Sequence, residues 1–119
     1  KSKDYYEGIN DLKAGNYKEA EAKLVRSFDE DPQNVWLAVQ LAKISLLQGD
    51  LDSFKKYIEK GRGIYPKYEP FYLLEAQQLY NENKFQASYE KLEALIDVNE
   101  RYLPIKPFFR AVKEKLDIN

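Results

Sequence analysis

The stretch from residue 35 to residue 49, VWLAVQLAKISLLQG, limits what this chain can fold into more than any other segment. The polar residues that interrupt its apolar run are Gln40, Lys43, Ser45 and Gln48. A helix that is apolar on nearly all sides is buried on nearly all sides. About 13 residues are too few to cross a bilayer, which takes ~20. We therefore expect this helix to be covered by protein on both sides, with flanks built like itself.

The flanking segments repeat the same pattern at an interval of 34 residues. Gly15 and Gly49 are separated by this interval, as are Pro32 and Pro66. Three further series keep it: Gly8, Ala42 and Ala76; Tyr17, Leu51 and Phe85; Leu24, Ile58 and Leu92. Small side chains let two helix axes approach to the short end of the ~8–10 Å range. A fixed period of this length predicts stacked helix pairs.

This pattern resembles the tetratricopeptide repeat, whose unit is two antiparallel helices in 34 residues. The family's small residue at the helix crossing stands at Gly8, Ala42 and Ala76. Its glycine in the turn stands at Gly15 and Gly49, with Asn83 as the third equivalent. Phe54, Leu95 and Glu100 depart from the family's small residues and terminal proline. The resemblance covers residues 1–102 in three units.

The resemblance implies an all-α fold, a right-handed α-solenoid of three antiparallel helix pairs plus a C-terminal capping helix. We expect one domain over residues 1–119, with repeats at 1–34, 35–68 and 69–102 and the capping helix at 103–119. Periodicity and stop signals place helices at about 2–14, 17–29, 35–49, 51–61, from Pro70 onward, and 84–97. Either Pro104 or Pro107 starts the last helix. Arg110 stands where the repeat needs a small residue, which favours a cap, but the start of a fourth repeat remains open.

Several helix ends carry recognisable capping signals. Asn16 with Glu19 predicts a capping box at the start of the second helix, and Asn83 with Gln86 gives the same signature displaced by one residue. Asp50 is suited to cap the fourth helix. We expect the fourth helix to end in the Gly-Arg-Gly segment at residues 61–63.

In the tetratricopeptide family the first helix of each pair lines a concave face, so the resemblance implies a binding surface there. Helical spacing selects ten residues: Tyr5, Tyr6, Ile9, Trp36, Gln40, Lys43, Leu47, Leu73, Leu74 and Gln77. Trp36 is the strongest candidate, because aromatic anchors among polar groups are typical of binding hot spots. For each apolar position taken alone, packing between repeats explains the periodicity equally well.

One subfamily of these repeats grips the C-terminal carboxylate of heat-shock chaperones with Lys and Asn side chains. The matching positions in this chain are Tyr5, Ile9, Gln40, Pro70 and Leu74. Apart from Gln40, these residues offer neither the charge nor the amide that the clamp needs. We therefore expect the chaperone-tail clamp to be absent, and the apolar lining favours an amphipathic helix or an extended apolar peptide.

Composition argues against several other functions. The chain has no His and no Cys, so the usual transition-metal sites and nucleophile–base pairs are missing. We expect no enzymatic activity, catalytic residue, metal or cofactor. A net charge of −1 gives no general attraction to nucleic acid. No segment suits direct membrane insertion.

The sequence thus predicts a protein–protein interaction module that binds a peptide or helix in a concave groove. The partner is another protein or another part of the same full-length chain, because a chain without Met suggests a part of something longer. The alternative is a structural segment that forms homo-oligomers within a multi-subunit assembly, docking through Phe108 and Phe109.

Overall fold

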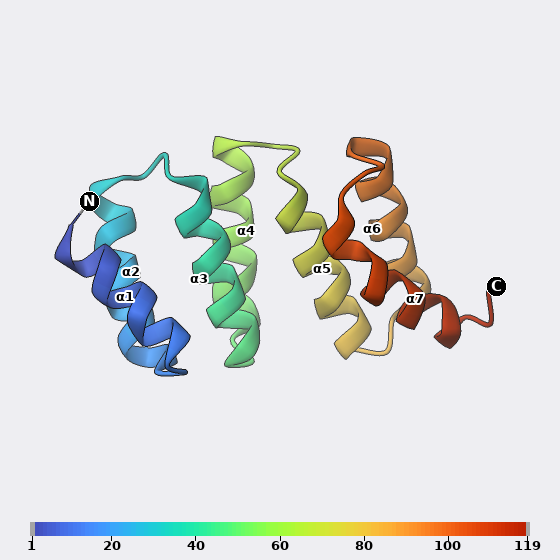
Figure 1. Cartoon of the computed structure of the whole chain (residues 1–119), viewed down its shortest axis with the longest axis horizontal. Coiled ribbons are helices and arrows are strands. Elements are labelled where there is room, and N and C mark those ends of the chain that lie inside the picture. Colours follow the sequence, from blue (N-terminus) through green and yellow to red (C-terminus); the bar gives the residue numbers. More distant parts are fainter. Residues whose placement is uncertain (1, 119) are drawn as a thin grey trace. The chain divides into compact units, whose positions relative to one another are not determined.

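The computed structural model describes residues 2–118, and all regular structure in that range is helical (Figure 1). The helices form three antiparallel pairs, α1 with α2, α3 with α4 and α5 with α6, followed by α7. Their bounds are α1 (Lys3–Lys13), α2 (Tyr17–Glu30), α3 (Val35–Leu47), α4 (Leu51–Ile64), α5 (Glu69–Asn81), α6 (Phe85–Val98), the 3₁₀ turn η1 (Leu103–Ile105) and α7 (Lys106–Lys115). The predicted all-α class of helix pairs with a C-terminal helix is confirmed.

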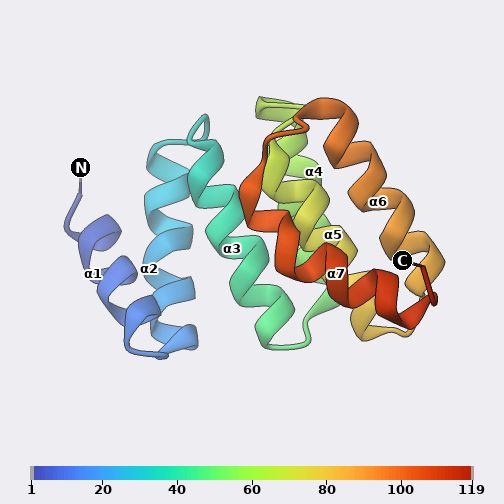
Figure 2. The same ribbon diagram turned by 45° about the vertical axis from the view of Figure 1, so that its right-hand side comes forward.

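The chain divides into two compact units, Lys1–Pro66 and Lys67–Asn119. Unit 1 holds the first two helix pairs, and α2 also packs against α3. Unit 2 holds the third pair together with η1 and α7, and α7 packs against α6. Figure 2 shows α7 running across the α5–α6 pair. The single domain over residues 1–119, with its repeat boundaries, stays a prediction.

The apolar helix of residues 35–47 is buried along most of its length. Its buried residues run from Leu37 to Ala42 and continue at Ile44 and Ser45. Within unit 1, α3 packs against both α2 and α4. The Ser45 hydroxyl donates to the Leu41 carbonyl oxygen at 2.9 Å, so this buried polar group is satisfied inside the helix.

The small residue at each helix crossing allows a close approach of the two helices. Gly8 faces Leu24 so closely that an added Cβ would lie 2.7 Å from Leu24 Cδ2. Ala42 and Ala76, the equivalent residues of the next two repeats, are fully buried. In unit 2 the core then continues from Ala76 through Leu92, Leu95, Ile105 and Val112. The small residues therefore recur at the same interval of 34 residues as the close contacts between paired helices.

The first helix of every repeat ends in the same turn. Gly15, Gly49 and Asn83 have φ values of 81°, 73° and 62°, in the left-handed region that Gly and, less readily, Asn adopt. The next residue closes each turn through its backbone N–H: Asn16 to Asp11 O at 2.8 Å, Asp50 to Ser45 O at 2.9 Å, and Lys84 to Leu79 O at 2.9 Å. This is the Schellman motif, and Gly in the turn is confirmed.

Helix α7 keeps the register of a first helix. Asp117 lies one repeat interval beyond Asn83, has a φ of 58°, and is followed by a hydrogen bond from Ile118 N to Lys113 O at 2.9 Å. The ends of α5 and α7, Asn81 and Lys115, are separated by the same interval. Pro107 lies in the first turn of α7, and Pro104 lies in η1. The C-terminal helix is thus built like the first helix of a fourth repeat.

The predicted helix caps were correct at Asp50 and wrong at two other positions. Asp50 accepts a hydrogen bond from Ser53 N at 3.1 Å. Asn16 precedes α2 with a similar backbone conformation but makes no side-chain cap. An amide can fill this role, because Asn34 caps α3 in the same way, and nothing in the structure explains the missing bond at Asn16. Asn83 lies in the left-handed turn, and Lys84 takes the N-cap position of α6 without a side-chain hydrogen bond.

The predicted end of the fourth helix was also wrong, because α4 continues through Gly61 and Gly63 to Ile64. Gly61 is buried, whereas a Cβ at Gly63 would meet no atom within 4 Å. Two glycines lower helix propensity, but packing in the repeat outweighs that local preference.

A matched pair of glycine substitutions tests the helix crossing. Gly8→Ala forces a Cβ against Leu24, so we expect the free energy of unfolding to fall by about 1 kcal/mol despite the gain in helix propensity. Gly63→Ala meets no such contact, so we expect a gain of about 0.5–1 kcal/mol. Urea denaturation followed by circular dichroism measures both values. Stabilisation by Gly8→Ala would contradict the crossing described here.

The Asp50 cap predicts an acid-dependent loss of stability. The hydrogen bond from Ser53 N holds the pKa of Asp50 below its ordinary value. A carboxyl whose pKa is lowered by folding stabilises the protein above the unfolded pKa of about 3.9, and this stabilisation is lost as pH falls through the folded value. Asp50→Asn, which keeps an acceptor oxygen but does not titrate, should reduce the loss of stability between about pH 5 and about pH 3. Thermal melts of both proteins across that range measure the effect, and identical pH profiles would contradict it.

Candidate functional site

Three aromatic rings join the first helices of the two repeats in unit 1. The ring centroids of Tyr5 and Trp36 are 5.8 Å apart, with planes tilted by 45°. Tyr6 meets Tyr5 edge-on at 5.3 Å. Tyr5 and Trp36 are half-buried, whereas Tyr6 is 56% exposed. These residues, called the aromatic cluster below, present apolar ring surface at the side of unit 1 formed by α1 and α3.

Side-chain caps at the starts of α1 and α3 fix the helix turns that carry Tyr5 and Trp36. Ser2 caps α1, and its Oγ accepts a hydrogen bond from Tyr5 N at 3.3 Å. Asn34 caps α3, and its Oδ1 accepts from Leu37 N at 3.3 Å. Because each cap defines the first turn of its helix, Tyr5 and Trp36 both project from a first turn. The sequence therefore places the two rings through capping as well as through packing.

Two salt bridges orient α1 on α2. Arg26 binds Asp4 through two hydrogen bonds, from Nη2 at 2.9 Å and from Nε at 3.2 Å. Lys23 Nζ lies 2.6 Å from Asp11 Oδ2. The hydrogen bond from Arg26 lowers the pKa of Asp4, and the hydrogen bond to Asp11 raises the pKa of Lys23. Both charged states are thus favoured at neutral pH, and the pairs fix the helix that carries Tyr5.

The other predicted residues of unit 1 differ in their accessibility. Lys43 and Leu47 lie along α3 beyond Trp36; Lys43 is exposed, and Leu47 is 62% exposed. Ile9 is half-buried on α1. Gln40 is buried, with 7% of its surface exposed. The accessible part of the predicted set in unit 1 is therefore the aromatic cluster with Lys43 and Leu47.

The three predicted residues of unit 2 lie on α5. Leu73 packs against the unit 2 core, Leu74 is buried, and Gln77 is half-buried. Their part in binding stays a prediction.

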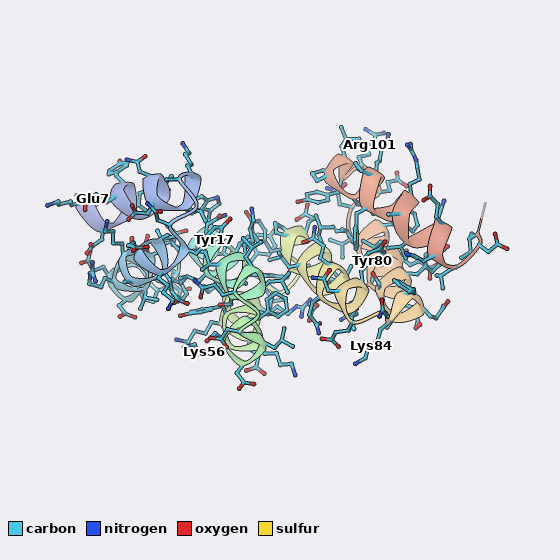
Figure 3. All side chains as sticks on the ribbon, turned by 90° about the horizontal axis from the view of Figure 1, so that it is seen from below. Glu7, Tyr17, Lys56, Tyr80, Lys84 and Arg101 are labelled. Carbon is cyan, nitrogen blue, oxygen red and sulfur yellow. The ribbon has the colours of Figure 1, made fainter. Side chains whose placement is uncertain are left out.

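The side chains of the proposed oligomerisation surface are packed within unit 2. Phe108 meets Tyr80 with ring centroids 5.3 Å apart, and Phe109 stacks on Tyr89 at 5.4 Å. Figure 3 shows Tyr80 between α6 and α7, and its ring also meets Phe85 at 5.1 Å. Docking of a second copy through Phe108 and Phe109 stays a prediction.

Sequence reasoning missed a small hollow beside Tyr5. It has a volume of about 180 Å³ and is lined by Ser2, Tyr5, Ser27, Glu30 and Asp31. It lies where α1 begins and α2 ends, because the two helices are antiparallel. The small Ser27 was the one sequence signal for it. In the described residues 2–118, no group of three or more His, Cys, Asp or Glu residues could hold a metal, and no helix has the length and apolarity to cross a membrane.

Residues 11–77, more than half of the chain, match the tetratricopeptide repeat family model. The chain belongs to the tetratricopeptide repeat family. The first tetratricopeptide domain of Spaghetti (RPAP3), bound to the HSP90 peptide SRMEEVD, is similar with a TM-score of 0.77 and 16% identity, over 94% of this chain and 89% of that one. No curated protein sequence matches the chain.

Two further solved structures have the same fold. The second tetratricopeptide domain of human RPAP3, in complex with the HSP70 peptide SGPTIEEVD, has a TM-score of 0.75 and 14% identity, over 92% of each chain. The Yersinia enterocolitica type III secretion chaperone SycD, in complex with a peptide of the translocator YopD, has a TM-score of 0.78 and 16% identity, over 96% of this chain and 87% of that one. At these identities the likeness shows the tetratricopeptide fold alone.

The contact between Tyr5 and Trp36 predicts a change in tryptophan fluorescence. Trp36 is the single tryptophan, so its emission reports directly on this contact. Tyr5→Ala removes the ring that covers one side of the indole, so we expect a red-shifted emission maximum and about twofold stronger acrylamide quenching. Tyr65→Ala, at an exposed tyrosine that follows α4, is the matched control and should leave both unchanged. Equal spectra for the wild type and Tyr5→Ala would rule out the contact.

Proposed function

We propose that this chain is a protein-interaction module that binds an apolar or amphipathic peptide or helix on the first-helix surface of unit 1. The observation that carries the proposal is the aromatic cluster of Tyr5, Tyr6 and Trp36, with accessible Lys43 and Leu47 farther along α3. Large rings that retain exposed surface beside a charged group have the composition of a binding hot spot. Ile9, which is half-buried, and Gln40, which is buried, belong to the same proposal.

The structural neighbours support a peptide as the ligand. The RPAP3 domains are described with chaperone peptides and SycD with a translocator peptide, so this fold presents peptide-sized surfaces in other proteins. For this chain we propose a similar use of α1 and α3. Leu73, Leu74 and Gln77 on α5 belong to the same proposal as the contribution of the third repeat.

The ligand we propose differs from the acidic chaperone tails. At the tail-binding positions on unit 1 the side chains are Tyr5, Ile9 and Gln40, which offer rings, an aliphatic surface and one amide. None of these three side chains is a cation that could pair with a peptide carboxylate, so desolvating a carboxylate at these positions costs free energy. We therefore propose that apolar side chains at helical spacing are the recognised feature.

Selection from a phage-displayed library of random 15-residue peptides tests this function. We expect selected peptides to carry apolar residues three or four positions apart, and Trp36→Ala to weaken their binding by about tenfold or more. Tyr65→Ala removes an exposed ring elsewhere in unit 1 and should change affinity less than about twofold. Fluorescence anisotropy of labelled peptides measures each dissociation constant.

The synthetic peptide SRMEEVD serves as the negative control in the same assay. The proposal predicts that it neither binds measurably nor competes with the selected peptides. Competition by SRMEEVD, or affinities that do not change in Trp36→Ala, would contradict the proposed surface.

A further inference from the structure

In each of the three helix pairs, the second helix covers one face of the first. In the first repeat that face carries Asp4, Glu7, Gly8 and Asp11, and α2 lies on it through Leu24 and the two salt bridges. Because α7 keeps the register of a first helix, its equivalent residues are Lys106, Phe109, Arg110 and Lys113. We call these four residues the cap face.

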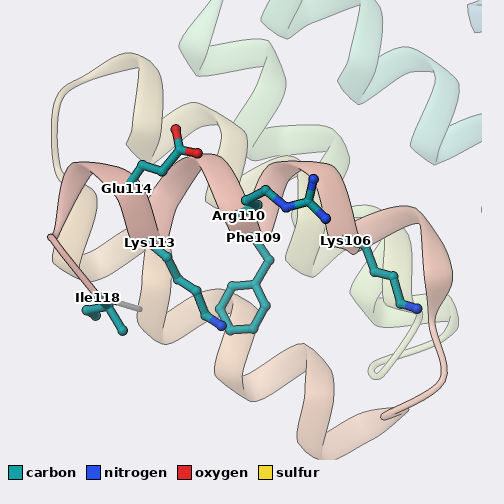
Figure 4. Close-up of a pocket in the computed structure, with 6 residues that line it drawn as sticks. All are labelled: Lys106, Phe109, Arg110, Lys113, Glu114 and Ile118. Carbon is teal, nitrogen blue, oxygen red and sulfur yellow. The ribbon is translucent and has the colours of Figure 1, made fainter.

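Among residues 2–118, no second helix covers the cap face of α7 as α2 covers α1. The cap face borders a hollow of about 410 Å³, which is also lined by Glu114 and Ile118 (Figure 4). In Figure 4, Lys113 and Phe109 project to one side of the helix, and Glu114 projects to the other. The hollow lies on the face that a second helix covers in the other repeats.

The charges of the cap face are inverted relative to the first repeat. There, Asp4 and Asp11 receive Arg26 and Lys23 of the covering helix at 2.9 and 2.6 Å. Lys23 also lies 3.7 Å from Glu7, and the equivalent pair of the third repeat, Lys91 with Glu75, lies at 3.4 Å. On α7, Lys106 and Lys113 replace the two aspartates. A helix that covers α7 in the same way must therefore bring acidic side chains.

The cations of the cap face have no acidic partner within the part of the chain that the structure describes. No ion pair among residues 2–118 involves Lys106, Arg110 or Lys113. The ammonium group of Lys113 lies 4.7 Å from the centroid of the Phe109 ring. These charges are thus available to a ligand, and Phe109 adds an apolar wall to the hollow.

We propose that the cap face binds an acidic amphipathic helix of a partner protein. The helix lies on α7 as α2 lies on α1, with carboxylates three residues apart, at the positions of Lys23 and Arg26, paired with Lys113 and Lys106. Opposite Arg110, where Leu24 meets Gly8 in the first repeat, the partner carries a small side chain. This site is separate from the aromatic cluster and does not depend on the function proposed for that surface.

The packing of the cap face disfavours a membrane or a nucleic acid as the ligand. The rings of Phe108 and Phe109 are held against Tyr80 and Tyr89, so they are not free to insert into a bilayer. The cap face offers three cations with Glu114 close by, fewer than the roughly 6–10 phosphate contacts of a typical nucleic-acid site. A short acidic helix matches both the number and the spacing of the charges.

A redesigned α2 peptide is a suitable probe. It has the sequence of Tyr17–Glu30 with Lys23→Glu, Leu24→Ala and Arg26→Glu, and the control peptide carries Leu24→Ala alone. Titration into the ¹⁵N-labelled full chain, followed by NMR, should give saturable shifts confined to α7 and its contacts with the acidic peptide only. Raising NaCl from about 0.05 M to about 0.5 M should weaken this binding several-fold, because the Debye length shortens.

Charge reversal on the protein makes the test specific. Lys106→Glu with Lys113→Glu should weaken binding of the acidic peptide about tenfold and allow binding of the control peptide, which keeps Lys23 and Arg26. Lys115→Glu, a single charge reversal on α7 outside the cap face, is the control for each lysine of the pair and should have less than about a twofold effect.

Several results would overturn the proposal. Equal affinity of the two peptides, or no saturable shift at about 1 mM peptide, would show that the acidic side chains are not recognised. Shifts centred on Tyr5 and Trp36, or a loss of affinity in Lys115→Glu as large as in the double reversal, would place the binding elsewhere. Tighter binding to anionic lipid vesicles or to an oligonucleotide than to the acidic peptide would also overturn it. So would self-association of the free chain that is abolished by the double reversal, because a second copy would then occupy the cap face.

Discussion

The close approach of two helices at one small residue is the contact on which the rest of this structure depends. Where Gly8 meets Leu24, the axes come near enough for the neighbouring side chains of both helices to pair or pack. Ala42 and Ala76 repeat that position, fully buried, in the next two pairs. Since neither helix of a pair can bury its apolar face alone, each pair becomes the unit of folding, and stacking becomes the way to bury what remains. The surfaces proposed for binding are the faces that this arrangement leaves open.

The same sequence positions serve different purposes in successive repeats. At the helix crossing the chain uses Gly or Ala three times and then Arg110. The flanking positions are acidic in the first repeat, where α2 supplies the cations, and basic on α7. A repeat protein can therefore change a structural contact into a ligand-binding one by changing a few residues on a conserved frame of helices. The aromatic cluster arises similarly, from rings at the capped starts of α1 and α3.

Most of the fold could be predicted from the sequence because its signals recur. The left-handed turns at Gly15, Gly49 and Asn83 each support the others, and the helix starts at Tyr17, Val35 and Leu51 were placed correctly. Local signals at the helix ends were less reliable. Asn16 is the N-cap residue of α2, but the predicted side-chain hydrogen bond is absent, and α4 continues through two glycines because tertiary packing outweighs local propensity. The sequence placed Arg110 in register but did not decide between a cap and a fourth repeat, because Arg110 breaks the small-residue series and Asp117 is an unusual residue for a left-handed turn.

The candidate surface was harder to predict than the fold. Periodicity identifies the faces of a helix but does not distinguish a side chain that packs between repeats from one that faces solvent. Leu47 is 62% exposed and Gln40 is 7% exposed, although both were selected by the same spacing. Hydrogen exchange of the chain, alone and with a library-selected apolar peptide, tests the central claim most directly. The account predicts new amide protection in α1 and α3, around Tyr5 and Trp36, and protection restricted to α2 and α4 would contradict it.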